Sequence, residues 1–379
     1  MSTTALKIAA LAGDGIGPEV MREAIKVLRA IQKKHAVPLE ITEAPVGWDA
    51  IDKQGEALPA NTLALCKKSG AILLGAVGLH YRDSAVPKEK RPERAALLRL
   101  GKQFDLYANL RPVKLPPVLA HLCPLRPERQ GDGIDITVVR ESTGGLYYAY
   151  PRKTEDVLEV KEPGIPTQRV ARAVDTMALT ATEIERIAHV AFRAAWLRRK
   201  KVTSVDKANI LETSILWREV VTEISRQYPQ VTLEHMLVDT AATQLMLQPT
   251  RFDVILCENT FGDILADEAA ALVGSVGMLP SASIGEPRQG RTFGLYKPAG
   301  GSAPDIAGKN VANPIALILA AALMLRYSFG LDPRARTIEN AVAKVIADGY
   351  RTQDICRLTE AKDRPVSTSE MGDAIADAI

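Results

Sequence analysis

Short apolar segments alternate with longer amphipathic segments along the chain, and this alternation limits the possible folds more than any other feature. Strand-length apolar or β-branched runs occupy residues 6–11, 71–77, 134–139 and 254–257. Segments with a helical repeat of apolar residues occupy 18–34, 183–199, 214–228, 263–273 and 314–328. Because strands that alternate with helices favour parallel pairing, the pattern predicts an α/β protein with an open, largely parallel sheet.

The length and composition restrict the class of protein further. The chain has 379 residues, whereas a single hydrophobic core rarely grows beyond roughly 250 to 300 residues, so we expect two domains. Hydrophobic residues make up 46% and charged residues 25%, which is typical of a folded globular protein. A net charge of only +3 argues against nucleic-acid or membrane partners and favours small-molecule chemistry.

The cysteines and the apolar segments predict a cytoplasmic protein. Cys66, Cys123, Cys257 and Cys356 are widely separated and form no CxxC pair, which favours reduced thiols over a zinc or redox site. The N-terminal residues lack the charged and apolar regions of a secretory signal. The longest apolar helical segment, 314–325, is far shorter than the roughly 20 residues that cross a bilayer.

A glycine-rich loop lies between the first expected strand and the first expected helix. Residues 13–19 read GDGIGPE. Their GxGxG spacing differs from the GxGxxG fingerprint of dinucleotide-binding folds. Taken alone, the loop also fits a glycine turn that requires positive φ angles.

Two acidic residues stand one helical turn apart in the segment RFDVILCENTFGDILADE. Asp263 and Asp267 are four residues apart, so they share one face of the expected helix. Near the carboxyl end of a strand, such a pair favours a divalent cation like Mg²⁺, which relieves the repulsion between the carboxylates. Solvated acids at a helix N-terminus are the alternative. Asp239, after the strand-like run 231–238, is a candidate third ligand.

Two arginines, a tyrosine and a lysine are candidates for substrate binding and proton transfer. Arg111 and Arg140 are expected in loops at the ends of elements. Guanidinium groups bind carboxylates through two parallel hydrogen bonds, although each arginine alone also fits a structural role. Tyr147 and Lys207 are candidate proton carriers, with a packed tyrosine and an exposed lysine as the alternatives.

Six motifs together resemble the isocitrate/isopropylmalate family of β-decarboxylating dehydrogenases. They are GDGIGPE at 13–19, NLRP at 109–112, VVRESTGG at 138–145, SVDKAN at 204–209, FGDILAD at 261–267 and GSAPDIAGKNVANP at 301–314. The motifs follow the family's order over nearly the whole chain. The resemblance implies a homodimer of two-domain α/β subunits, each built on one long mixed sheet flanked by helices. It also implies active sites in the interdomain cleft that are shared between subunits.

The resemblance further implies how the chain divides into domains. Residues 1–106 and 275–379 would form a discontinuous cofactor-binding domain. Residues 107–274 would form the domain for substrate, metal and dimerisation. Within it, prolines and mixed charges at about 148–167 favour a loop or an exposed hairpin, which could be a dimer arm.

By the same resemblance, the reaction is the oxidative decarboxylation of a 2-hydroxy diacid. The implied cofactors are NAD and Mg²⁺ or Mn²⁺, with a monovalent cation such as K⁺ in addition. Asp263 and Asp267 would bind the metal, and Asp239 of the neighbouring subunit would complete the site and contact the substrate. Lys207, also from the second subunit, would take part in removing the hydroxyl proton, and Tyr147 would protonate carbon.

The resemblance places the remaining binding residues in two groups. Arg111 and Arg140 would hold substrate carboxylates. The positions that match the cofactor-binding segments are Gly301, Ser302, Ala303, Pro304, Asp305 and Asn313 near the adenosine, and Gly15, Ile16 and Glu93 towards the nicotinamide. Because a carboxylate at Asp305 accepts hydrogen bonds from a ribose 2′-hydroxyl and repels a 2′-phosphate, we expect NAD rather than NADP.

Apolar residues at the substrate positions favour an alkylmalate. Leu97 and Leu98, with Ile210 of the other subunit, match the positions that face an alkyl group. The expected substrate is therefore a 3-alkylmalate, above all 3-isopropylmalate, and the expected setting is leucine biosynthesis.

Two positions depart from the family pattern. Gly101 stands where the family has an arginine that holds a substrate carboxylate, and the segment 94–96 is one residue longer than usual. Arg99 or Lys102 could replace that arginine. Lys297 stands where the family has a glutamate beside the cofactor loop. These departures leave two alternatives open: a sister enzyme for tartrate, a longer alkylmalate or a phosphonate analogue, and a catalytically silent regulatory paralogue.

Overall fold

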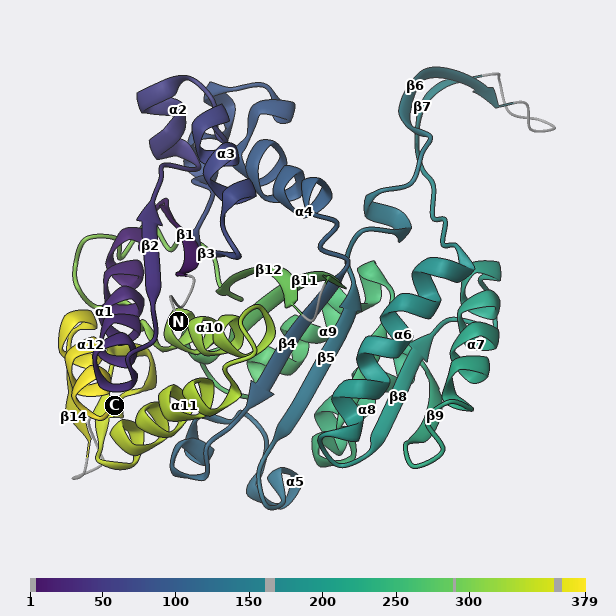
Figure 1. Ribbon diagram of the computed structural model, residues 1–379. Helices are drawn as coiled ribbons and strands as arrows, with labels where there is room; N and C mark the ends of the chain where they lie inside the picture. The colour runs from purple at the N-terminus through teal and green to yellow at the C-terminus, as the bar shows by residue number, and fades with distance from the viewer. Residues whose placement is uncertain (1–4, 161–167, 289–290, 358–362) are drawn as a thin grey trace.

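The computed structural model describes residues 5–160, 168–288, 291–357 and 363–379, and its centre is one ten-stranded sheet flanked by helices (Figure 1). The strands lie in the order β2-β1-β3-β12-β11-β4-β5-β10-β8-β9. Their bounds, in the same order, are Leu39–Glu43, Leu6–Gly13, Ala71–Ala76, Arg291–Pro298, Pro280–Arg288, Ala108–Lys114, Asp135–Glu141, Val254–Cys257, Lys201–Asp206 and Thr232–Leu237. The long mixed sheet that the family resemblance implies is thereby confirmed.

The sheet is largely parallel, as expected, with six parallel pairings, but its three central pairings are antiparallel. β12 pairs with β11, β11 with β4 and β4 with β5 in antiparallel fashion. The outer strands pair in parallel, as the alternation of strands and helices predicts. The difference arises from strands β4, β11 and β12, which alternate polar with apolar residues and therefore lack the continuous apolar runs of the buried parallel strands.

Several of the helices begin or end at recognisable sequence signals. The longer ones are α1 (Gly17–His35), α6 (Ala181–Trp196), α7 (Glu212–Ser225), α8 (Val238–Leu247), α9 (Asn259–Ala271), α10 (Ile315–Tyr327), α11 (Asp332–Ala347) and α12 (Thr368–Asp377). α1 has a proline in its first turn and basic residues in its last turn. α6 begins with a capping box, in which Thr180 and Glu183 satisfy each other's backbone N–H groups. None of the helices among the described residues has the length and hydrophobicity needed to cross a membrane.

Shorter helices from residues 48–103 lie together at the top of Figure 1. They include α2 (Trp48–Gln54), α3 (Ala60–Lys68) and α4 (Arg99–Gln103), while α5 (Pro127–Gln130) lies at the other end of the sheet (Figure 1). α4 continues directly from a π-helical turn at Glu93–Leu98. Because a π turn takes one residue more than an α turn, it accommodates the extra residue expected at 94–96.

A separate hairpin projects from the body of the protein (Figure 1). β6 (Arg152–Val160) and β7 (Gln168–Asp175) pair in antiparallel fashion, so the returning strand extends beyond residue 167. Residues 161–167 lie outside the described part of the chain. The role of this hairpin as a dimer arm stays a prediction, as does the division into 1–106 with 275–379 and 107–274. In the sheet, that division would fall between β11 and β4.

Candidate active site

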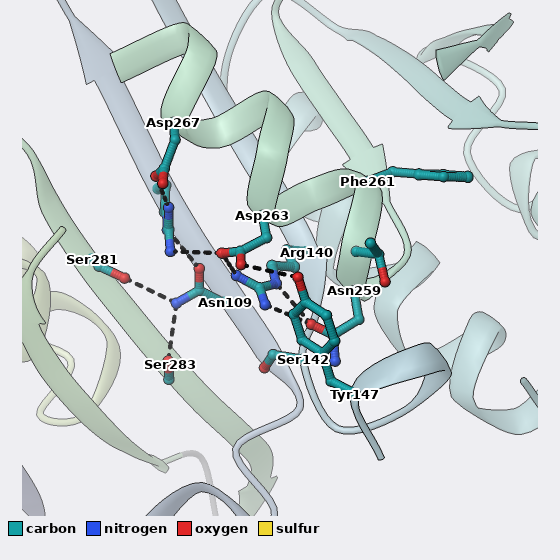
Figure 2. Close-up of polar contacts among 12 residues, drawn as sticks. Asn109, Arg140, Ser142, Tyr147, Asn259, Phe261, Asp263, Asp267, Ser281 and Ser283 are labelled. Carbon is teal, nitrogen blue, oxygen red and sulfur yellow. Dashed lines mark hydrogen bonds and ion pairs between the residues drawn. The ribbon is translucent and has the colours of Figure 1, made fainter. Parts of the chain in front are cut away.

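Polar side chains form a continuous row on one face of the central antiparallel strands (Figure 2). Asn109 of β4 donates hydrogen bonds of 2.9 Å to the hydroxyls of Ser281 and Ser283 on β11. Its own side-chain oxygen accepts a 3.2 Å bond from Nε of Arg111, two residues along the same strand. Arg140 of β5 stands opposite Asn109 in the strand register. This row provides a rigid base for the ionic groups above it.

The two site arginines belong to strands, which corrects the expectation of loop positions. Arg111 lies in the middle of β4, and Arg140 is the last residue but one of β5. Strand residues two apart point to the same face, so Asn109 and Arg111 are both directed at the site. In β4, polar residues alternate with apolar ones, so the sequence shows no continuous apolar run there. The same alternation directs Arg111 to the site.

Asp263 and Asp267 lie on one face of α9, as their spacing predicts, and arginine binds both of them. Arg111 donates a 2.6 Å bond to Asp267 and a 3.4 Å bond to Asp263. Arg140 forms an additional short ion pair with Asp263. Asn259 accepts bonds of 2.9 and 2.6 Å from Arg140, which fixes the plane of the guanidinium. Figure 2 shows this alternation of acids and arginines.

Two features of α9 allow this close approach. Glu258 caps the helix by accepting bonds from the backbone N–H groups of Thr260 and Phe261, at 2.9 and 2.6 Å. At Gly262, an added Cβ would lie 2.8 Å from Cγ of Arg140. Glycine at this position therefore lets the arginine side chain cross the helix surface and reach Asp263.

Tyr147 completes this cluster of groups as a proton donor. Its hydroxyl donates to Asp263 at 3.4 Å, and the Arg140 guanidinium lies 5.7 Å from the centre of its ring. Burial and then the negative charge of Asp263 raise the pKa of the Tyr147 hydroxyl above its usual value. The hydroxyl therefore keeps its proton at neutral pH and is available as a hydrogen-bond donor.

The carboxylate oxygens of Asp263 and Asp267 are suitable ligands for a hard divalent cation. Among the described residues of one chain, no three His, Cys, Asp or Glu side chains come together as a metal site. Within one chain, Asp263 and Asp267 would therefore be the acidic side chains that this cluster offers to such a cation. The donor chemistry fits Mg²⁺ or Mn²⁺, in agreement with the clustering expected from the sequence.

Lys207 and Asp239 form a separate pair within one chain. The Lys207 ammonium donates a 2.5 Å bond to the Asp239 carboxylate, and this contact lowers the pKa of Asp239. Lys207 follows β8, and Asp239 lies in the first turn of α8. Nearby Ile210 is 70% exposed. These three residues are the ones for which the family resemblance implies a role in the neighbouring subunit's site.

Several residues of the expected cofactor site converge beside the glycine loop. The backbone N–H of Ile16 donates a 2.8 Å bond to the carbonyl of Ser302, and the Ser302 hydroxyl donates to the carbonyl of Gly78. Gly15 has a φ of +56°, and an added Cβ would lie 2.0 Å from the Ser302 carbonyl oxygen. The Glu93 carboxylate lies against Gly78. The loop at 13–17 and the segment from residue 301 thus form one structure.

The other predicted cofactor residues differ in exposure and in contacts. Gly301 and Asp305 are exposed, Ala303 and Pro304 are partly buried, and Ala303 has a φ of +39°. Asn313 contacts the protein itself: its side-chain oxygen accepts a 3.0 Å bond from the backbone of Ile315 at the start of α10. The Asp305 carboxylate is exposed, and nothing lies within 4 Å of the place that a Cβ at Gly301 would take.

Leu97 and Leu98 present an apolar surface on the π-helical turn. Leu97 packs against the smaller of two hydrophobic clusters, whereas Leu98 is 46% exposed. Arg99 and Lys102, considered as replacements for the missing family arginine, are both exposed. Gly101 lies between them, and an added Cβ there would meet only the Tyr148 hydroxyl, at 3.9 Å.

Sequence reasoning gave no role to two asparagines that position the site. Asn109 connects Arg111 to the β11 serines, and Asn259 orients Arg140 and donates a 2.9 Å bond to the carbonyl of Gly144. Asn109 stands two residues before Arg111, and Asn259 stands four residues before Asp263. An amide at strand or helix spacing from a charged site residue shares its face, and this is the signal that would have identified them.

Comparisons with known proteins agree with this arrangement. The sequence profile described as isocitrate/isopropylmalate dehydrogenase matches residues 7–375. Proteins named 3-isopropylmalate dehydrogenase from Geobacter metallireducens and Haemophilus influenzae are each 54% identical to the chain, over 98% of its length and 99% of theirs.

Solved structures have the same fold. Isocitrate dehydrogenase from Methylococcus capsulatus matches with a TM-score of 0.80 and 35% identity, covering 98% of both chains. The apo form of a β-decarboxylating dehydrogenase from Thermococcus kodakarensis matches with a TM-score of 0.74 and 31% identity, over 98% of this chain and 95% of that one. The fold and the site thus define an oxidatively decarboxylating dehydrogenase. The chain belongs to the isocitrate/isopropylmalate dehydrogenase family.

Proposed function

We propose that this enzyme oxidises and decarboxylates 3-isopropylmalate, with NAD⁺ as hydride acceptor and Mg²⁺ or Mn²⁺ as metal cofactor. The observation that carries the proposal is the cluster of Asp263 and Asp267 with two carboxylate-binding arginines. The exposed apolar side chain of Leu98, at a position that matches the alkyl-facing pair of the family, agrees with it. The relatives named 3-isopropylmalate dehydrogenase support the choice of substrate. Leucine biosynthesis in the cytoplasm is the corresponding setting.

Each charged group has one role in this proposal. Asp263 and Asp267 would hold the metal, which polarises the substrate's hydroxyl and carbonyl oxygens when bound. Arg111 and Arg140 bind substrate carboxylates by bidentate hydrogen bonds. Tyr147 gives its proton to the carbon that loses CO₂.

The active site needs a second subunit. Lys207, Asp239 and Ile210 are held apart from Asp263 and Asp267 within one chain, and Ile210 is largely exposed. In a homodimer, Lys207 of the partner takes up the hydroxyl proton as hydride leaves for NAD⁺. Asp239 of the partner completes the oxygen ligands, and Ile210 covers the isopropyl group. A monovalent cation such as K⁺ is a further proposed activator.

The test of this function is NADH formation with a panel of diacids. The substrates are 3-isopropylmalate, malate, tartrate, isocitrate and a longer alkylmalate, each with Mg²⁺ or Mn²⁺, and CO₂ is followed in parallel. We expect equal amounts of NADH and CO₂ with 3-isopropylmalate, and kcat/KM at least about 100-fold below it with isocitrate, because Leu97 and Leu98 cannot pair with a third carboxylate. Preferential turnover of isocitrate or malate would contradict the proposal.

Gly101 supports a second candidate function, a sister dehydrogenase for a different 2-hydroxy diacid. The site lacks the side chain that the family uses there, and the space beside Gly101 is limited only by Tyr148. Preferential turnover of tartrate, a longer alkylmalate or a phosphonate analogue in the same panel would establish this alternative. A silent regulatory paralogue would show no turnover alone and would copurify with an active homologue.

The preference for NAD provides a separate prediction. Replacing Asp305 with serine removes the charge that repels a 2′-phosphate, so the ratio of kcat/KM for NAD to that for NADP should fall at least about tenfold. Initial rates with each nucleotide measure the ratio. The matched control is Asp348→Ser, which changes an acid on the surface at the end of α11. An unchanged ratio in Asp305→Ser would show that Asp305 does not select the nucleotide.

A further inference from the structure

Lys297 faces the candidate site from the strand next to β11. In the β11–β12 register, Lys297 stands opposite Ser281, which accepts a hydrogen bond from Asn109. Leu295, two residues earlier on β12, points to the same face. Leu295 belongs to the hydrophobic cluster that includes Leu100 of α4. The face that carries Lys297 is therefore the one that packs against the segment 93–103.

The Lys297 ammonium is partly buried and bonds to a backbone carbonyl group. Its Nζ donates a 2.7 Å bond to the carbonyl of Pro298. In the part of the chain that the structure describes, no carboxylate lies within ion-pair distance of it. Burial, and then the nearby Arg111, lower the pKa of Lys297 to about 8. A cation in this environment is stabilised when an anion binds beside it.

The charges around Lys297 leave a net positive site. Arg111, Arg140 and Lys297 provide three cations, whereas Asp263 and Asp267 provide two anions. A divalent metal on the aspartates would increase the positive charge further. The site is therefore complementary to a dianion, as a malate derivative is at neutral pH.

Gly101 explains why a cation at position 297 is useful. α4 contributes no side chain at Gly101, whose neighbour in space is Tyr148. Tyr148 is itself close enough to Arg140 for the guanidinium to lower its pKa, although burial, the larger cause, raises it. An arginine at 101 would thus extend towards the Arg140 side of the site. Lys297 also lies close enough to the Arg140 guanidinium for the two charges to interact.

We propose that Lys297 is a substrate-binding residue, whose ammonium holds a carboxylate of the 2-hydroxy diacid in place of the arginine absent at Gly101. The two departures from the family pattern then form one compensating pair. This inference rests on the proposed function, because it assigns a contact to the substrate of that reaction.

The direct test is the kinetics of Lys297→Met. Methionine is an unbranched side chain of similar length to lysine, but it carries no charge. Loss of a charge-assisted contact should raise the KM for 3-isopropylmalate about 10- to 100-fold. kcat and the KM for NAD should stay within about threefold of the wild-type values, because the contact is made in substrate binding. Substrate alone, without NAD, should raise the unfolding temperature of Lys297→Met less than that of the wild type. Lys297→Gln provides a second neutral variant if the methionine variant folds poorly.

Two further variants separate substrate binding from a structural role. Gly101→Arg in the Lys297→Met background should recover at least about tenfold in the KM for 3-isopropylmalate, because the lost charge returns from α4. Lys114→Met, an exposed lysine at the far end of β4, is the matched control and should leave all kinetic constants unchanged.

The outcomes distinguish this inference from the proposed function. Wild-type turnover of 3-isopropylmalate with an unchanged KM in Lys297→Met would overturn the role of Lys297 and leave the function intact. A rise confined to the KM for NAD would overturn it as well, since the contact would then be with the cofactor. Failure of the wild-type enzyme on 3-isopropylmalate would overturn the function and this inference together.

Discussion

Replacing Lys207 with methionine is expected to lower kcat about 100- to 10,000-fold, because the variant has no group to accept the substrate's hydroxyl proton. The KM for NAD should change little, since Lys207 lies outside the residues that converge on the glycine loop. NADH formation under saturating 3-isopropylmalate, with Mg²⁺ present, measures the loss. Lys344→Met, which removes an exposed lysine from α11, should retain full turnover.

A second variant separates proton transfer from the ion pair with Asp239. Lys207→Arg retains a positive charge that can bind Asp239, but arginine keeps its proton at any pH at which the enzyme is folded. We therefore expect Lys207→Arg to be nearly as slow as Lys207→Met. If arginine restored turnover, Lys207 would act through its charge, and its assignment as a base would be wrong.

Replacing Asp263 with asparagine is expected to lower kcat/KM at least about 1,000-fold at a fixed Mg²⁺ concentration. Asp263 is contacted by Arg111, Arg140 and Tyr147, so it is the centre of the ionic cluster. Its neutral replacement removes a proposed metal ligand and leaves two arginines to repel each other. The loss should exceed that of Asp267→Asn, because the Asp267 side chain is 74% exposed.

Metal binding and folding must be measured alongside activity for Asp263→Asn. Equilibrium dialysis with Mn²⁺ should show weaker binding to the variant in the presence of substrate. Thermal unfolding reports whether the loss is structural, and Asp263→Glu keeps the charge but moves the oxygens by one methylene. Asp348→Asn is the matched control on the surface. Wild-type Mn²⁺ affinity in Asp263→Asn would remove this residue from the metal site.

The buried parallel strands could be predicted from sequence because both of their faces are apolar. β1, β3 and β10 match continuous apolar runs to within two residues. β11 and β12 could not be recognised in the same way, because Ser281, Ser283 and Lys297 interrupt their apolar pattern. These polar residues point towards the site. Residues placed for the site therefore interrupt the apolar pattern by which a strand is recognised in the sequence.

The charged residues of the candidate site could be predicted from the motifs. The long-range contacts that position them could be predicted much less well. The spacing of Asp263 and Asp267 alone places both on one helical face, where Arg111 contacts them. The bonds from Asn109 and Asn259 depend on strand register and helix docking, which bring together residues more than 100 positions apart. One sequence provides no direct information on such long-range pairs.

The boundary between β11 and β4 has a consequence for the site. These strands are joined by a register of three residue pairs, from Ala282–Leu110 to Ile284–Ala108, and the sheet continues through them without interruption. The side chain of Asn109 crosses this boundary, because it donates to Ser281 and Ser283 on β11 and accepts from Arg111 on its own strand. A substitution of either serine would therefore change the support of Arg111 through a single amide group.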